Sequence, residues 1–294
     1  MAPVATSALA LAGVALSAFP GAGAKMLLKV MGQSGKFMFY DSGGSESSGI
    51  TVTMDALKEV DSQGNEVGKR GSVKHSINSF ASQSFTIAAK ESGVDIWAAT
   101  ADRVNFTSSI GSNTETVGQL MVETYLMTEN GTVGTDNESW DVLVGDLKWN
   151  IAFPEWKFCA PCGAGNNAET GAFLDLTITI SGKGSAAAKG SGKVEIGGGA
   201  VLNLAKSVTI DRSSVDMPSG YPMVETQGSK TMITFRFPKF STSALYDPTI
   251  TGASGAAAAT TATTTGSPTS GAPCSAPWAA ALLLPLTGLL GPPM

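Results

Sequence analysis

The amino-acid sequence predicts an all-β protein, folded as one antiparallel β-sandwich or as two tandem sandwich halves. Short segments in which apolar and polar residues alternate recur throughout residues 25–250. Glycine-rich turns separate these segments, and no part of this region has a sustained helical periodicity. Alternation with a period of two is typical of strands, and many short strands at near-regular spacing indicate a sandwich.

The first half of this region contains most of the shorter predicted strands. Gly32–Gly35 has the composition of a turn between two apolar runs, and Asp61–Asn65 has that of a hairpin loop. Alternating or β-branched residues predict the strands themselves, which are residues 25–31, 36–40, 50–54, 84–87, 104–107, 119–128, 140–144 and 147–151.

The second half contains the clearest alternation, at residues 173–180. We expect one face of this strand in the core, namely Leu174, Leu176, Ile178 and Ile180. The outward face then carries Phe173, Asp175, Thr177 and Thr179. No basic residue near Asp175 in the sequence offers an ion pair, so we expect its carboxylate to face solvent. Residues 207–210 predict a further strand, and residues 232–237 place Ile233, Phe235 and Phe237 inward.

Residues 147–158 and 232–240 are similar to each other. Each is an alternating strand closed by Phe-Pro and then Lys-Phe. Duplicated sandwich halves at about residues 25–160 and 161–250 would explain this similarity, and two similar edge strands are the alternative. Glycine, serine, alanine and lysine dominate Gly182–Gly199, which predicts a mobile loop or a wide hairpin.

The first 24 residues have the layout of a secretory signal peptide. An uncharged apolar stretch runs from Ala8 to Phe19, and Ala22-Gly23-Ala24 forms a small-residue cleavage site before Lys25. This stretch is too short to span a bilayer. We therefore expect removal of residues 1–24, which leaves residues 25–250 as an extracellular ectodomain. A buried N-terminal helix is the alternative.

The composition changes twice after Asp247, the last charged residue. Residues 251–272 are rich in Thr, Ala, Gly and Ser, as in a stalk, and residues 273–294 contain a short apolar run. Small residues, a short spacer and a brief apolar terminus are typical of a GPI-attachment signal. We expect lipid attachment at Ser270, with Ser254 as a more distant option, and a membrane contact through the lipid. A transmembrane anchor and a plain secreted tail are the alternatives.

All of the charges, 19 basic and 24 acidic residues, fall within the ectodomain. This mild acidity does not fit nucleic acid or anionic lipid as a partner, because both require clustered cations. A secreted protein folds in an oxidising compartment, so we expect a disulfide between Cys159 and Cys162. Three Asn-x-Ser/Thr sequons are expected glycosylation sites, at Asn105, Asn130 and Asn137.

Two stretches of the sequence resemble a known family. The first consists of Lys148–Ile151, Pro154–Cys159 and Gly171–Leu176, and the second of Phe235–Phe240 and Tyr246–Pro248. Both resemble acidic skeletal organic matrix proteins of corals, over about residues 60–251. The resemblance implies a secreted or membrane-associated protein with the β module of that family. The acidic runs that are thought to bind calcium and mineral there do not occur in this sequence, so that function is not carried over.

Sequence patterns for catalysis or cofactor binding are incomplete. His75 is the single histidine, no G-x-S-x-G motif accompanies it, and we expect it on the surface or at a strand edge. One histidine and two ectodomain cysteines do not complete the usual zinc set, so neither a metal nor a cofactor is expected. Cys159-x-x-Cys162 has thioredoxin-type spacing, but a glycine-rich loop follows in place of the helix that would lower the cysteine pKa.

Three loop segments have weaker similarities to ligand sites. Gly32–Phe37 lacks the spacing and the hydroxyl residue of a phosphate-binding loop, so we expect a hairpin turn there. Asp61–Glu66 and Asp136–Glu138 carry calcium-type ligands, but neither matches the EF-hand pattern, and solvated turns explain both.

The sequence therefore predicts a non-enzymatic cell-surface or extracellular-matrix glycoprotein with a structural or adhesive role, whose partners are matrix components or glycans. Two other classes stay open. A secreted glycan hydrolase would use two carboxylates, which no local pattern nominates. A carbohydrate-binding module would use exposed rings from among Trp97, Trp140, Trp149 and Trp156, although a sandwich core can also bury these side chains.

Overall fold

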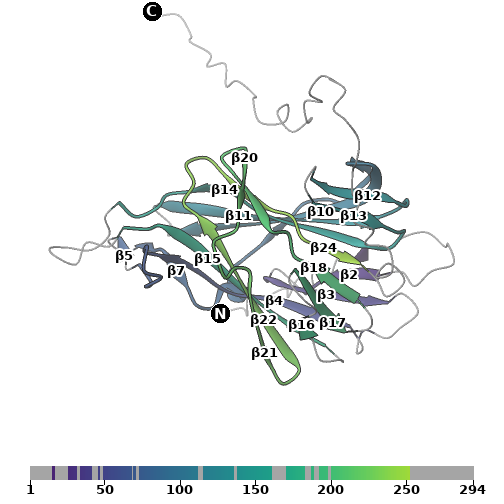
Figure 1. The fold of residues 1–294 in the computed structure, drawn as a ribbon, viewed down its shortest axis with the longest axis horizontal. Coiled ribbons are helices and arrows are strands. Elements are labelled where there is room, and N and C mark those ends of the chain that lie inside the picture. The colour runs from purple at the N-terminus through teal and green to yellow at the C-terminus, as the bar shows by residue number, and fades with distance from the viewer. Residues whose placement is uncertain are drawn as a thin grey trace, which may run out of the picture. The chain divides into compact units, whose positions relative to one another are not determined.

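The computed structural model describes most of the predicted ectodomain as antiparallel strands (Figure 1). The described residues are 15–16, 26–31, 34–41, 46, 49–67, 69–70, 73–111, 115–135, 138–160, 170–182, 187–188, 192–197 and 200–251. They contain no α-helix, and the short 3-10 turn η2 spans Phe80–Ser82. No helix in this part of the chain is long and apolar enough to cross a membrane. Apart from Thr251, which ends β24 (Thr249–Thr251), the predicted stalk and GPI signal lie outside the described residues.

The first of the two large sheets contains eight strands. Its order is β1-β2-β3-β4-β15-β22-β21, and β7 pairs with β4 beside this path. The strands are β1 (Ala15–Leu16), β2 (Met26–Val30), β3 (Lys36–Asp41), β4 (Ile50–Val60), β7 (Ser76–Ile77), β15 (Phe173–Ser181), β21 (Met223–Gln227) and β22 (Lys230–Pro238).

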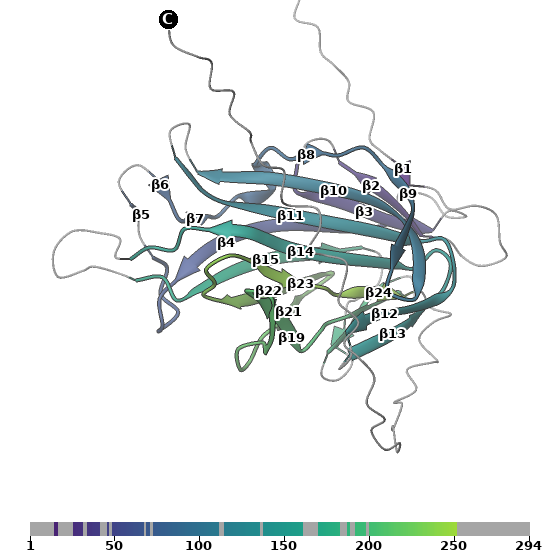
Figure 2. The same ribbon diagram turned by 90° about the horizontal axis from the view of Figure 1, so that it is seen from above.

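The second large sheet contains twelve strands in the order β16-β17-β18-β24-β14-β11-β10-β8. Four others extend it: β9 pairs with β10, β23 pairs with β14 and with β19, and β20 pairs with β19. Figure 2 shows β10, β11 and β14 side by side. The strands are β8 (Thr86–Ile87), β9 (Glu91–Ile96), β10 (Ala99–Gly111), β11 (Thr116–Met127), β14 (Leu147–Trp156), β16 (Ala187–Ala188), β17 (Lys193–Gly197), β18 (Ala200–Asn203), β19 (Ser207–Ile210), β20 (Ser213–Asp216), β23 (Ala244–Tyr246) and β24 (Thr249–Thr251).

Two hairpins form separate two-stranded sheets. One consists of β5 (Lys69–Arg70) and β6 (Val73–Lys74), and the other of β12 (Gly131–Thr135) and β13 (Glu138–Val142). The second hairpin covers part of the outer face of the large second sheet. Val133 and Val142 from the hairpin form a small buried cluster with Tyr125 and Met127 of β11. For this reason β11 is buried on both faces at its end, where alternation alone predicts one polar face.

The two large sheets pack against each other through their apolar faces. Side chains from both belong to one buried cluster, including Leu176 and Phe235 from the first sheet and Trp149 and Phe153 from the second. The rings of Phe153 and Phe237 lie 5.1 Å apart, centroid to centroid, across this core. The predicted antiparallel sandwich is therefore confirmed. Burial of this shared apolar surface is the main force that holds the sheets together.

The predicted faces of β15 and β22 are confirmed. The four inward residues of β15 are at most 2% exposed, and Ile233, Phe235 and Phe237 of β22 are fully buried. The two strands pair antiparallel, so that residue 176 lies opposite residue 235 and the two inward sets form one apolar surface.

Asp175 is on the outer face of β15 as predicted, but its carboxylate is not left to solvent. Arg236 lies directly opposite on β22 and donates from Nε and Nη2 to the two carboxylate oxygens, at 2.8 and 2.6 Å. The guanidinium also lies over the rings of Phe173 and Tyr221. Because Arg236 is 61 residues away in the chain, proximity in the sequence did not reveal this partner.

The two halves of the chain are interleaved in both sheets. β4 pairs with β15, and β14 pairs with β24, so a division near residue 160 would break both sheets. The described pairing therefore does not separate two tandem sandwiches. The two similar segments form β14 and β22, which are inner strands of opposite sheets. β14 continues through Pro154 because a one-residue bulge opposite β11 accommodates the proline.

We predict that Leu176→Asp unfolds the domain, whereas Thr177→Asp lowers the free energy of unfolding by about 1 kcal/mol or less. Leu176 is fully buried, and a carboxylate placed there has no partner. Thr177 lies on the outer face and loses only a hydroxyl contact with Thr234. Thermal unfolding of the purified proteins, followed by near-ultraviolet circular dichroism, measures both effects. Greater damage from the Thr177 variant would contradict the assigned faces.

Candidate functional site

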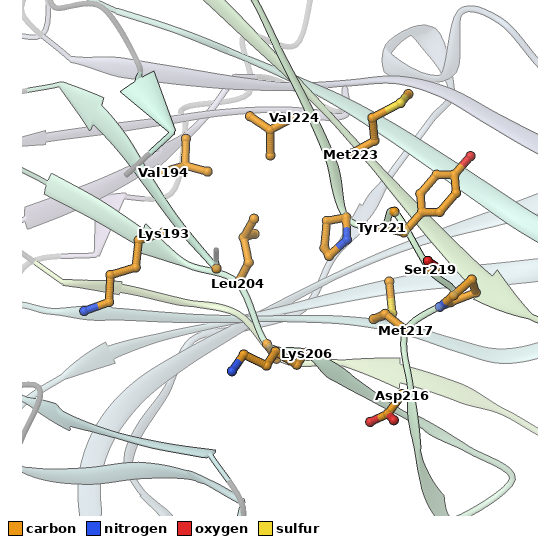
Figure 3. A pocket seen from close by; sticks show the side chains of 15 residues that line it. Lys193, Val194, Leu204, Lys206, Asp216, Met217, Ser219, Tyr221, Met223 and Val224 are labelled. Atoms are coloured by element: carbon orange, nitrogen blue, oxygen red, sulfur yellow. The ribbon is translucent and has the colours of Figure 1, made fainter. Parts of the chain in front are cut away.

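A cleft of about 650 Å³ opens at the edge of the sandwich, and we call it the edge cleft (Figure 3). Its lining comes from residues 192–194 at the start of β17, residues 204–206 after β18, and residues 216–224 between β20 and β21. The cleft thus lies between the edge strand β21 of the first sheet and the β17–β18 hairpin of the second. Local turns shape it, since Leu204 donates its N–H to Gly192 and Tyr221 donates to Pro218.

The floor of the edge cleft is apolar. Val194, Leu204 and Met217 belong to the buried core of the sandwich, and Tyr221 and Val224 are partly buried against it. At this edge the core is therefore reached from outside. A cleft of this size with an apolar lining is typical of a site for a small ligand.

The rim of the edge cleft carries three charged side chains. Lys193 and Lys206 lie together on one side of the apolar lining, while Tyr221 and Met223 lie on the other (Figure 3). Asp216 is the single carboxylate among the described residues that line the cleft. Met223 is 38% exposed, which is unusual for a large apolar side chain in this structure.

A second group of polar residues, the Glu59 cluster, is buried at another end of the sandwich. It contains Glu59 at 0% and His75 at 2% exposure, together with Trp156 and Cys159. The Glu59 carboxylate accepts from the Trp156 indole Nε1 at 2.9 Å and from the backbone N–H of Cys159 at 2.7 Å. It also lies 2.8 Å from Nδ1 of His75. These contacts supply the partners that a buried carboxylate requires.

The backbone around the Glu59 cluster is closely fitted. Gly171 lies against the carboxylate, and a Cβ atom at this position would come within 1.8 Å of Glu59 Oε1. The expected surface or strand-edge position of His75 is therefore only partly correct. The residue lies between the short strands β6 and β7, but its ring is buried because β7 pairs with β4 and carries it beside Glu59.

The Glu59 cluster contains the ligand types of a metal site, because atoms of Glu59, His75 and Cys159 lie within 4.8 Å of one another. The chemistry of these atoms does not fit a metal. Cys159 is disulfide-bonded, so its sulfur is not a thiolate, and the Glu59 oxygens are already bound to donors. The cluster fits a structural role.

The predicted partner of Cys159, Cys162, lies outside the described residues, so the pairing of these two cysteines stays a prediction. Asn137 and Ser270 also lie outside the described residues, so glycosylation at Asn137 and lipid attachment at Ser270 stay predictions as well. Asn130 is exposed in the turn before β12, and its Oδ1 accepts from the N–H of Val144 at 2.9 Å. Asn105 is half-buried in the middle of β10. The surroundings of Asn130 therefore suit a glycan better than those of Asn105.

The four tryptophans proposed for glycan binding do not form a common surface. Trp149 and Trp156 are 1% and 5% exposed and belong to the core, and Trp140 is partly buried against it. Trp97 is 54% exposed in the turn between β9 and β10. The sandwich core thus accounts for three of these side chains.

Two acidic turns are satisfied within the chain. The Asp61 carboxylate accepts from the side-chain amide of Asn65 and from the backbone N–H groups of Gln63 and Asn65, which lowers the pKa of this exposed group. Asp211 accepts from the backbone N–H groups of Ser241, Thr242 and Ser243, and these bonds hold its pKa well below the usual range. Both carboxylates stabilise turns.

The outer face of the second sheet carries a further cluster, the outer-face polar cluster, on β10, β11 and β14. Lys148 is 1% exposed, and its ammonium donates to the Asp247 carboxylate at 3.0 Å. Burial lowers the pKa of Lys148, and Asp247 opposes this effect. Glu123 accepts from the Tyr125 hydroxyl and from the amide of Asn150, at 3.2 and 3.4 Å. Sequence analysis nominated none of these residues, because their partners come from different strands.

The chain matches a family model described as acidic skeletal organic matrix protein, over residues 21–195 and 189–273. These ranges include every strand of both large sheets except β1.

We predict that Glu59→Gln lowers the free energy of unfolding by about 3 kcal/mol or more, because an amide cannot accept from all the donors around it. Glu66→Gln is the matched control. Glu66 pairs with Lys58 at 3.0 Å on the surface, where both side chains are at least 36% exposed. This change should cost about 1 kcal/mol or less. Urea unfolding measures both, and equal effects would contradict the structural role of Glu59.

We also predict that stability decreases above about pH 10, where tyrosines ionise in the unfolded chain. Burial raises the pKa of Tyr125 and of Tyr246 above 10.0. A raised pKa in the folded state stabilises the fold below the unfolded pKa, and this contribution is lost as the pH rises through the folded pKa. The double variant Tyr125→Phe with Tyr246→Phe should therefore show a smaller decrease in the free energy of unfolding between pH 9 and 11, as measured by urea denaturation. An unchanged slope would contradict this prediction.

Proposed function

Because the chain belongs to the family of acidic skeletal organic matrix proteins, we propose that it is a non-enzymatic structural or adhesive component of an extracellular matrix. In this proposal the sandwich is displayed at the cell surface. A stalk of residues 251–272 and a GPI anchor at Ser270 hold it there. Membership of the family is compatible with an extracellular structural role, and the surface display and the adhesion are the proposed steps beyond it.

The observation that carries this proposal is the way in which the polar clusters are used. Glu59, Asp211 and the Asp175–Arg236 pair each bind partners on neighbouring segments of the fold. Groups held in this way stabilise a rigid module. A glycan hydrolase of the usual kind would instead need two carboxylates that converge on a cleft, whereas Asp216 is the single carboxylate among the described residues that line the edge cleft.

The proposed processing leaves most of the family match in the mature protein. The match begins at residue 21, just before the predicted cleavage after Ala24, and ends at residue 273, where the predicted GPI signal begins. The segments predicted to be removed thus lie almost entirely outside the matched region. Asn130, with its exposed amide, is the sequon that we propose carries a glycan.

We predict that cells expressing the full chain display the ectodomain and adhere to plates coated with extracellular matrix. Phosphatidylinositol-specific phospholipase should release the protein and reduce adhesion to the level of untransfected cells. A chain truncated after residue 272 should appear in the medium and leave the cells non-adherent. Mass spectrometry of the surface protein should begin at Lys25.

Two outcomes would contradict the proposal. Recovery of the intact peptide 278–294 from surface protein would exclude the GPI anchor. Equal adhesion of cells with and without the displayed protein would exclude an adhesive role. A structural role would then be tested by asking whether the protein is extracted together with the matrix.

A further inference from the structure

We propose that the edge cleft binds an anionic amphiphile, namely a free long-chain aliphatic carboxylate whose chain occupies the apolar floor and whose head group lies between Lys193 and Lys206. This site goes beyond the proposed function, since neither surface display nor adhesion requires a small ligand.

The apolar floor fits the chain of such a ligand. The cleft volume of about 650 Å³ lies within the range that proteins use for small molecules. Its floor consists of core side chains such as Val194, Leu204 and Met217, so an aliphatic chain would extend the hydrophobic core. Water gains few hydrogen bonds over such a surface, and its displacement by an apolar group favours binding.

The rim fits an anionic head group. Among the described residues, no carboxylate lies within ion-pair distance of the ammonium group of Lys193 or Lys206. Figure 3 shows both lysines on the side of the lining away from Tyr221 and Met223. Asp216 is the carboxylate among the described lining residues, and the Glu138 carboxylate beside Lys206 is already bound by the backbone N–H of Lys206 at 2.8 Å. The two ammonium groups, which have no carboxylate partner among the described residues, therefore favour an anion over a cationic ligand.

Other ligand classes fit this cleft less well. A neutral sugar needs several hydrogen-bonding side chains beside an aromatic face, whereas most of this lining is aliphatic. A membrane surface would need a larger cluster of cations than two lysines. A carboxylate with one charge and one long chain uses both the floor and the rim.

The test uses the mature protein purified without detergent from cells that express the full chain. Calorimetric titration with dodecanoate, below its micelle concentration, should show saturable binding at one site. Lys193→Gln with Lys206→Gln should weaken this binding about fivefold, the effect of removing partly exposed ion pairs. The same double variant should bind the uncharged 1-dodecanol as the unaltered protein does. Val224→Trp should fill the cleft and abolish binding of both probes.

Lys36→Gln is the matched control, because Lys36 is exposed on β3 and does not line the cleft. It should leave the affinity for dodecanoate unchanged. Absence of saturable dodecanoate binding to the unaltered protein would overturn the proposal. An equal loss of dodecanoate affinity in the Lys36 variant would also overturn it. The same conclusion would follow if the double lysine variant lost affinity for dodecanol and for dodecanoate to the same extent. None of these results would alter the adhesion measurement, which is made without added ligand.

Discussion

The carboxylate of Glu59 joins four parts of the fold at one end of the sandwich. It extends from β4 in the first sheet and accepts from Trp156 on β14 in the second. Cys159 and His75 complete its surroundings from two connecting segments. Because an unpartnered buried carboxylate costs several kcal/mol, these segments are stable only together. The apolar core attracts the two sheets to each other, and this polar contact fixes how they meet.

The stretches that resemble the family contain residues that bind each other in the fold. Lys148 pairs with Asp247, and the N–H of Trp149 donates to the carbonyl of Pro248 at 3.1 Å. Asp175 and Arg236 form the second such contact, between β15 and β22. The two stretches, which are far apart in the sequence, therefore lie in contact in the fold.

The polar and apolar surfaces of the molecule serve different purposes. The buried polar groups of the Glu59 cluster and the outer-face polar cluster hold strands together, so they are unsuited to exchange partners with a ligand. The edge cleft differs, because its floor is core surface and its lysines have no carboxylate partner among the described residues. Binding of a small molecule at this opening, as proposed above, would require no change in the two sheets.

The sequence by itself determined the all-β class, at least part of each of the six longest strands, and the faces of β15 and β22, because the period of two depends only on local backbone geometry. It did not reveal Glu59 as a buried residue. The alternation from Ile50 to Met54 assigns residues 56 and 58 to the core, but a bulge in β4 beside Thr177 shifts the inward positions to Leu57 and Glu59. The partner of Asp175, the burial of His75 and the edge cleft were likewise decided by tertiary structure. Each depends on which distant strands become neighbours, and strand pairing is set by the packing of the whole sandwich.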